Sequence, residues 1–268
     1  MDISKFIRHF LLFLLPVLIA GCGTGLNVKK NHLPEIKKVA VVSVYCPAVI
    51  TIDNQRQAPV FYAVDATVQS GMRSQAAIKE FKPRGTMLLN KSQNIIIEKL
   101  SENFGWQITP VSSSVKNNAY KSLVSWSDKN SKNFSPILMP LNDSALLWIN
   151  KDEAELKKLS AEFCVLTGSD AVMFLSFDFA YSKSWFKGSG ISAKARTFIG
   201  IQLVDKRGDL IISTPRADER EREFSEMADT TMPLQGWTAD INETTIKTFD
   251  SSIENSAAKV ISMLKAAK

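Results

Sequence analysis

The chain begins with an unbroken apolar run behind a short basic segment. Residues 10–20 (FLLFLLPVLIA) carry no polar side chain, and Lys5 and Arg8 precede them. A run of about 11 residues is too short to span a bilayer, which takes roughly 20, but it has the length of the apolar segment of a secretory signal peptide. We therefore predict that residues 1–21 are a signal peptide, which the mature protein lacks.

The rest of the chain alternates between strand and helix patterns. Residues 37–44 (KKVAVVSV) form a β-branched run that is typical of a buried strand. Residues 85–104 repeat apolar side chains at helical spacing, and residues 106–111 return to a strand pattern. A second helix is predicted over residues 152–163, before a further buried strand at residues 170–177 (DAVMFLSF).

The last part of the chain predicts a hairpin and a helix. Residues 191–204 alternate apolar and polar side chains, which indicates a half-buried strand. Residues 205–209 (DKRGD) form a turn with glycine, and residues 210–213 return as the second strand. Residues 242–265 repeat apolar side chains at helical spacing, so we expect a long C-terminal helix.

The order of these elements predicts the architecture. Helical connections between the first strands favour parallel pairing, because a parallel pair needs a long crossover. We expect an α/β domain of three layers, in which helices cover a mixed sheet of parallel strands plus a C-terminal hairpin. This single domain is predicted to span residues 36–268.

Two polar segments interrupt the domain, near residues 46–80 and 112–150, and we interpret them as insertions. In the first, residues 60–64 could form a strand and residues 74–81 a short helix that ends before Pro83. The second has the composition of a surface excursion with short helices.

The signal peptide ends in a motif with a cysteine. Ile19, Ala20, Gly21 and Cys22 together resemble the lipobox of bacterial lipoproteins. The resemblance implies that the first three residues are read by the signal peptidase and that the Cys22 sulfur carries a diacylglycerol. The next residue is Gly23, and the absence of an aspartate there implies outer-membrane sorting in a Gram-negative cell.

Acylation at Cys22 would make the bilayer the first partner of this protein. Several acyl chains on one residue anchor durably, because each buried methylene contributes about 0.8 kcal/mol. We interpret residues 22–35 as the acylated cysteine and a flexible tether. The expected location is the periplasmic face of the outer membrane.

The charge of the chain excludes one class of partner. The formal charge of +6 falls to +5 when Asp2, Lys5 and Arg8 leave with the signal peptide. The basic residues are dispersed and form no run of the kind that binds nucleic acid. We therefore expect no nucleic-acid partner.

Two cysteines, Cys46 and Cys164, remain in the domain beside Cys22. Both lie in apolar sequence, where a free cysteine behaves as a small hydrophobic residue. If the strands near Val39 and Val172 are parallel, the two cysteines are separated by roughly 20 Å or more. A disulfide needs Cα atoms within about 7 Å, so this geometry favours two free thiols and leaves a disulfide as the alternative.

Histidine is scarce, which limits the chemistry. His9 leaves with the signal peptide, and His32 stays as the one histidine of the mature protein. That count excludes a Ser-His-Asp or Cys-His catalytic site and a histidine-based zinc site. We predict no catalytic residue, no metal and no cofactor. His32 is interpreted as a solvated residue of the tether, and the alternating charges of residues 216–223 as an exposed, ion-paired segment.

Four short motifs carry a resemblance to a protein family. They are VAVV at residues 39–42, FGW at 104–106, GSDAVM at 168–173 and LVDKRGDLI at 203–211. These motifs resemble those of envelope lipoproteins that include the curli secretion-channel lipoprotein and the lipoprotein activators of penicillin-binding proteins. Their shared three-layer α/β domain is related to the amino-terminal domain of the Tol translocation protein. The resemblance implies a role in binding and regulating other envelope proteins.

The sequence thus favours a protein-binding or envelope-assembly module. One alternative is an oligomeric secretion-channel lipoprotein, with residues 191–204 and 60–64 as membrane hairpins. Others are an unrecognised hydrolase and a surface-exposed antigen. Trp126, Phe134 and Trp148 lie in or beside the second insertion, and aromatic residues are enriched at binding hot spots. They are the candidate surface for an envelope protein partner, and the alternative is that they cover the core.

The lipid anchor gives a first testable prediction. We expect the wild-type protein to partition into detergent and to carry the added mass of acyl chains on Cys22. Cys22→Ala should leave the protein unprocessed or free of the membrane fraction. Mass spectrometry of the purified N-terminal peptide measures this, and an unmodified amino terminus in the wild type would refute the lipobox interpretation.

Overall fold

The computed structural model describes residues 26–48, 50–53, 71–134, 138–150, 153–184, 191–214, 216–217, 225–234, 247 and 249–267. The predicted signal peptide, Cys22, the predicted strand at 60–64 and the charged residues 218–223 lie outside the described residues.

The described strands form one mixed sheet of nine. The strands are β1 (Asn27–Val28), β2 (Lys38–Pro47), β3 (Thr51–Asp53), β4 (Gln107–Thr109), β5 (Leu138–Pro140), β6 (Ala171–Ser184), β7 (Ile191–Asp205), β8 (Leu210–Ser213) and β9 (Ser225–Leu234). Their order is β1-β8-β7-β6-β2-β4, while β3 also pairs with β6, β5 with β2 and β9 with β7. β2 pairs in parallel with β4 and β6, whereas β6, β7 and β8 pair antiparallel. Both the parallel strands and the hairpin are as predicted.

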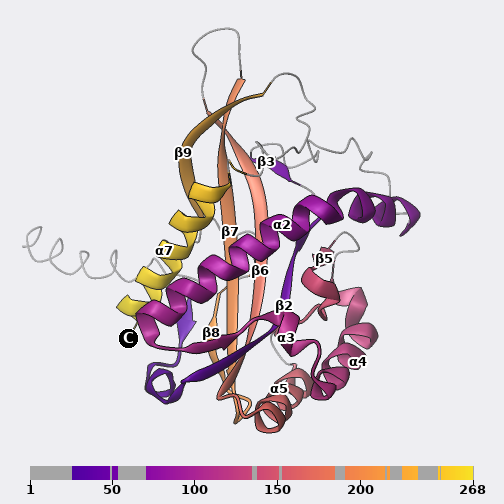
Figure 1. Cartoon of the computed structure of the whole chain (residues 1–268), viewed down its shortest axis with the longest axis vertical. Coiled ribbons are helices and arrows are strands. Elements are labelled where there is room, and N and C mark those ends of the chain that lie inside the picture. Colours follow the sequence, from indigo (N-terminus) through magenta and orange to yellow (C-terminus); the bar gives the residue numbers. More distant parts are fainter. Residues whose placement is uncertain are drawn as a thin grey trace, which may run out of the picture.

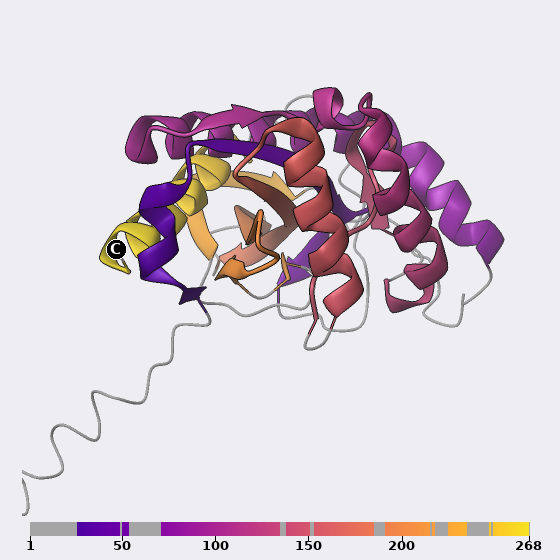
Figure 2. The same cartoon turned by 90° about the horizontal axis from the view of Figure 1, so that it is seen from below.

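Helices cover both faces of the sheet, so the domain has the three predicted layers (Figure 1). The α-helices are α2 (Gly71–Phe104), α3 (Val111–Ser114), α4 (Lys121–Asn130), α5 (Ala154–Thr167) and α7 (Asp250–Ala266). Short 3-10 helices are η1 (Lys30–Glu35), η2 (Asn118–Tyr120), η3 (Ser131–Asn133) and η4 (Leu141–Asp143). Helices α2 and α7 lie on one face, and α4 and α5 lie on the other, as the view from below shows (Figure 2). The α/β fold class is confirmed.

The strand β6 separates two apolar cores. Every residue from Ala171 to Ala180 is buried. Met173 and Leu175 face the core beneath α2 and α7, and Val172 and Phe174 face the core beneath α4 and α5. Successive side chains of a strand point to opposite faces, so a continuous apolar run is what a strand covered on both faces needs.

The neighbouring strand β7 differs from its prediction in one respect. Ala195 and Ile199 face the core beneath α7, as the alternation predicted. On the other face, however, Phe198 and Gln202 are also buried, so β7 is not half-exposed in this part. The Gln202 amide accepts a hydrogen bond from the Ile149 N–H and donates one to the Ile149 carbonyl, and this pairing satisfies a polar group that the alternation places in the exposed set.

The predicted helix end before Pro83 is wrong. Pro83 lies inside α2, which runs unbroken from Gly71 for 34 residues. Proline removes one helical hydrogen bond, here the one to the carbonyl of Lys79. Both residues are exposed, so water can satisfy that carbonyl. The helical turns after Pro83 are stabilised by core packing, which begins with the buried side chains of Leu88 and Leu89.

The predicted tether is also shorter than expected. β1 pairs antiparallel with β8, and η1 follows it directly. Leu33 and Ile36 are buried in the core beneath α7 and α2. Residues 27–35 therefore belong to the folded domain, because β1 is part of the sheet and the Leu33 side chain is buried in the core.

Cys46 and Cys164 are free thiols, as the strand geometry predicted. Cys46 lies in the core beneath α2, and Cys164 lies in the core beneath α5. The sheet separates them.

Among the described residues, no helix combines the length and the apolar composition that a membrane span requires.

The packing of α7 gives the second testable prediction. Ile253 on α7 is fully buried in the core that α7 shares with α2. Ile253→Ala should lower the free energy of unfolding by about 2–5 kcal/mol, since it leaves a cavity. Urea unfolding of the unlipidated Cys22→Ala protein measures this change. Ser251→Ala, at an exposed position of the same helix, is the matched control, and equal midpoints for the two variants would contradict this packing.

Candidate functional site

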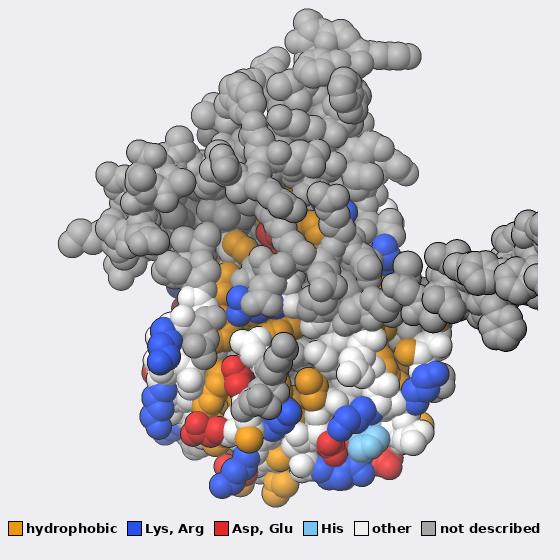
Figure 3. Space-filling view, turned by 180° about the vertical axis from the view of Figure 1, so that it is seen from behind, with side chains coloured by type: hydrophobic (Ala, Val, Ile, Leu, Met, Phe, Trp, Pro, Cys, Tyr) orange, Lys and Arg blue, Asp and Glu red, His pale blue; other side chains and the backbone are white. Residues whose placement is uncertain are grey.

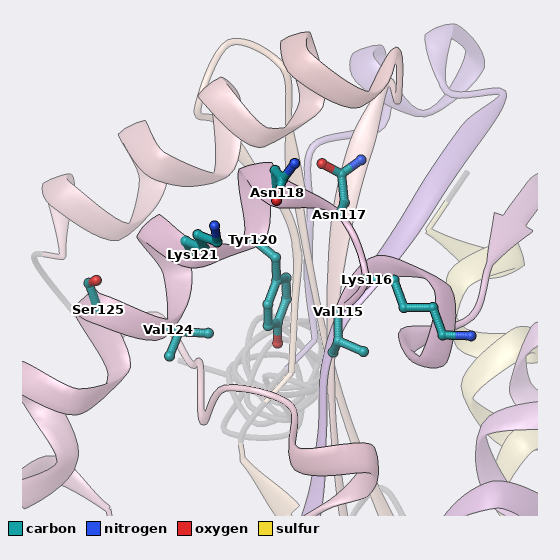
Figure 4. A pocket seen from close by; sticks show the side chains of 8 residues that line it. All are labelled: Val115, Lys116, Asn117, Asn118, Tyr120, Lys121, Val124 and Ser125. Atoms are coloured by element: carbon teal, nitrogen blue, oxygen red, sulfur yellow. The ribbon is translucent and has the colours of Figure 1, made fainter.

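A shallow depression opens on the surface beside α4. It has a volume of about 470 Å³ and lies where η2 leads into α4 (Figure 4). Its lining residues are Val115, Lys116, Asn117, Asn118, Tyr120, Lys121, Val124 and Ser125. All of them come from the second predicted insertion, where the sequence indicated a surface excursion.

The floor of the depression is rigid because Tyr120 is locked into the core. Its hydroxyl donates to the carbonyl of Val42 on β2 and accepts from the N–H of Ala145. Its ring meets the Phe163 ring edge-on at 6.2 Å. Burial raises the pKa of the Tyr120 hydroxyl, while the hydrogen bond from Ala145 works against that rise. The phenol is therefore a structural support with its proton already engaged.

The rim of the depression is polar and positively charged. Lys116 and Lys121 lie on opposite sides of Tyr120 (Figure 4). Both lysines are exposed, and no carboxylate of the described residues forms an ion pair with either. The Asn117 side-chain oxygen accepts a hydrogen bond from the Ala119 N–H and so caps η2. Exposed Val124 adds an apolar side chain, so the depression can receive a chain segment that carries both a carboxylate and an apolar group.

A second polar cluster lies in the turn between β7 and β8. The buried carboxylate of Asp205 accepts hydrogen bonds from the backbone N–H groups of Arg207 and Asp209. It also accepts one from the Arg207 Nε, at 2.8 Å. Gly208 adopts φ 82° here, and a side chain would also approach the backbone oxygen of Lys157. Burial alone would raise the pKa of the Asp205 carboxyl, but these hydrogen bonds hold it below its usual value.

His32 joins this cluster, which corrects its interpretation as a solvated tether residue. Its Nδ1 lies 3.4 Å from an Asp205 oxygen, and the guanidinium of Arg207 meets the same nitrogen. Ligand atoms of His32, Asp205 and Asp209 lie within 4.8 Å of one another, the spacing of a metal site. A metal ion at this position would compete with the Arg207 guanidinium for the Asp205 oxygen that faces His32. The arrangement is that of a braced turn, and we assign no metal to it.

The predicted partner residues are buried. Trp126, Phe134 and Trp148 expose only 4%, 7% and 3% of their surface. Phe134 and Trp148 meet the Tyr45 ring edge-on at 6.0 and 6.5 Å, inside the core beneath α4 and α5. The structure corrects their assignment to a partner surface: they cover the core. Large aromatic side chains bury a large apolar area, which accounts for their place in the core.

The sequence did not single out the residues of the depression. They are lysines and asparagines without a regular pattern, and no short motif marks them. The one available signal was the Asn117-Asn118 pair before a helical stretch, since asparagine is favoured at helix N-caps.

Comparisons with known proteins give a likeness to solved structures alone. No protein-family model matches the chain, and no curated protein matches it. Among solved structures, the chain is similar to a lipoprotein of Neisseria meningitidis at 12% sequence identity, over 83% of this chain and 98% of that chain, with a TM-score of 0.24. At this TM-score the likeness carries no argument about function.

The Asp205 turn gives the third testable prediction. The folded-state pKa of Asp205 is lowered, so its ionised form stabilises the fold above the unfolded pKa near 4, and this stabilisation is lost as the pH falls through the folded pKa. Asp205→Asn should reduce the free energy of unfolding at pH 7 by about 1–3 kcal/mol and should flatten its decline below pH about 4. Urea unfolding across this pH range measures both effects.

Asp209→Asn is the matched control, because its side chain is half-exposed and bound to exposed Lys29. An exposed ion pair contributes at most about 1 kcal/mol. If the free energy of unfolding of Asp205→Asn changes with pH as that of the wild type does, this carboxylate does not stabilise the turn.

Proposed function

We propose that this protein is a lipoprotein of the bacterial envelope whose domain holds a protein partner at the periplasmic face of the outer membrane. The observation that carries the proposal is the lipobox at Ile19–Cys22 behind the apolar run. The lipid would hold the domain close to the bilayer, since β1 begins at Asn27, five residues after Cys22.

The chemistry of the described residues supports binding over catalysis. Burial raises the pKa of the Cys46 thiol, and it raises the pKa of Cys164 to about 12, where Asp205 and Asp170 add to the effect. Neither thiol is a nucleophile at neutral pH, because the thiolate is the reactive form. His32 is engaged in the braced turn, so it is not poised to activate a hydroxyl. These features give the hydrolase alternative no support.

The secretion-channel alternative also gains no support from the described part of the chain. It assigned residues 191–204 to a membrane hairpin. In the fold, Ile199 and Ile201 of that stretch lie in the core with α7 residues such as Ile253. Exposing them would open that core.

The depression beside α4 is the contact site in this proposal. Its partner would be a segment of an envelope protein that carries an acidic side chain, because Lys116 and Lys121 are exposed and pair with no carboxylate of the described residues. Val124 gives the same segment an apolar contact. A rigid floor under adaptable polar side chains lowers the entropy cost of binding.

Photocrosslinking in living cells gives the fourth testable prediction. A photoreactive amino acid at Val124 should yield a discrete crosslinked band, identified by mass spectrometry as an envelope protein. Reversing the charges with Lys116→Glu and Lys121→Glu should reduce that band about tenfold or more, since two favourable contacts become repulsive.

The matched controls lie outside the depression. Lys129→Glu, on the same helix, should leave the crosslinked band unchanged. Placing the photoreactive amino acid at Lys132 instead of Val124 should abolish the band. All charge variants should keep the wild-type melting temperature, because these side chains are exposed. A band that persists in the doubly reversed variant would exclude the depression as the contact site.

A further inference from the structure

One end of the sheet gathers elements from distant parts of the chain. We call it the basal end and define it by η1, the starts of β2 and β6, the last turn of α5 and the 205–209 turn. Asp170 accepts the N–H groups of Lys37 and Lys38, and the Lys206 N–H donates to the Asp170 carbonyl. These hydrogen bonds hold the starts of β2 and β6 and the turn side by side.

The basal end carries the most exposed large apolar side chains of the described residues. Val165 and Leu166 are 72% and 71% exposed, against 51% for Met87, the next in rank. They lie in the last turn of α5, which Gly168 ends with φ 68°. The chain then passes directly to Asp170, so this apolar pair lies within a few residues of the hydrogen bonds that define the basal end.

Basic side chains share the basal end with that apolar pair. Lys29, Lys30, Lys37, Lys38, Lys206 and Arg207 are exposed at the basal end, which also holds Glu35, Asp170, Asp205 and Asp209. The carboxylates are engaged: Asp170 and Asp205 accept backbone N–H groups, Glu35 pairs with Arg207 and Asp209 pairs with Lys29. Lys30, Lys37 and Lys38 form no ion pair with a described carboxylate.

This combination of charge and apolar surface is visible from behind. Figure 3 shows basic, acidic and apolar side chains together along the lower edge of the molecule. Basic side chains around exposed aliphatic ones are typical of a surface that rests on an anionic bilayer, where the aliphatic groups enter the headgroup region and the cations stay at the phosphates.

The short link to Cys22 brings the bilayer within reach of this end. Five residues span at most about 18 Å from Cys22 to Asn27. Asn27 pairs with Ser213, which pairs with Gln202, three residues before Asp205 at the basal end. Three residues of strand cover about 10 Å, so an acylated Cys22 can reach the plane of the basal end.

We propose that the basal end docks on the anionic phospholipid surface of the membrane that holds the lipid anchor. This inference rests on the proposed acylation of Cys22. Val165 and Leu166 enter the headgroup region, while Lys30, Lys37 and Lys38 contact the phosphates. β6 and β7 then stand away from the bilayer, and their 14 and 15 residues place the opposite end of the sheet about 45 Å from it.

Lysine labelling on vesicles tests this docking. The mature lipidated protein is added to preformed vesicles, either of phosphatidylcholine alone or of equal parts phosphatidylcholine and phosphatidylglycerol. A membrane-impermeant amine-acylating reagent is applied, and mass spectrometry reports the labelling of each lysine. We expect the labelling of Lys30, Lys37 and Lys38 to fall several-fold on the anionic vesicles, with Lys121 and Lys132 unchanged, and high salt should weaken the protection.

A variant pair separates docking from mere proximity to the anchor. The double variant Val165→Asp and Leu166→Asp should restore the labelling of the three lysines on anionic vesicles. Its two carboxylates at the end of α5 are repelled by the anionic lipid. Met87→Asp, an equivalent change at another exposed apolar position, should leave the protection intact. Unchanged melting temperatures would confirm that each variant is folded.

Three results would overturn the proposal. The first is equal labelling of the basal lysines on both kinds of vesicle, and the second is protection of Lys121 in their place. The third is protection that needs an added envelope protein, which would make the basal end a protein-binding surface. An unacylated Cys22, seen in the mass of the N-terminal peptide, would instead refute the proposed function.

Discussion

Burial of β6 on both faces is the constraint on which the rest of the structure depends. β2 pairs with one edge of this strand in parallel and β7 pairs with the other edge antiparallel. Its side chains contribute alternately to the core beneath α2 and α7 and to the core beneath α4 and α5. A polar substitution at Phe174 or Leu175 would therefore expose or strain one whole layer, since an unpaired buried polar group costs several kcal/mol.

The same strand sets the geometry of the two proposed contact surfaces. The α5 helix must end where β6 begins, and Gly168 makes that reversal in a left-handed conformation. The reversal leaves Val165 and Leu166 outside both cores, at the end of the sheet where the Asp170 and Asp205 hydrogen bonds lie. On the other side of α5, Phe163 supports Tyr120 and with it the floor of the depression. Both proposed contact surfaces thus depend on α5, one on its end and the other on its packing against Tyr120.

Regular patterns were sufficient to predict the main elements. The apolar runs of β2 and β6, the alternation of β7 and the helical spacing of α5 and α7 each appear in the sequence, because burial repeats with the period of the element. Tertiary context decided the rest. Pro83 is tolerated since its helix continues into a packed face. Residues 27–35 join the domain through buried Leu33 and through the pairing of β1 with β8.

The candidate sites were harder to predict than the fold. Trp126 and Phe134 have polar neighbours and Trp148 lies in the short apolar run 145–149, so composition alone did not show whether they face a partner or the core. The basal end joins residues as distant as Lys37, Leu166 and Arg207, and only the pairing of β2, β6 and β7 brings them together. The resemblance to a lipobox at Cys22, in contrast, is carried by four consecutive residues, so no fold is needed to predict it.

We propose, above all, that the lipid and the fold together place one end of the sheet on the bilayer. Nitroxide accessibility measures this most directly. With the mature protein on anionic vesicles, a spin label at position 166 should be reached readily by oxygen and poorly by a water-soluble nickel chelate, since the label enters the lipid. A label at position 124 should show the reverse. Equal exposure of both labels to the nickel chelate would contradict the account.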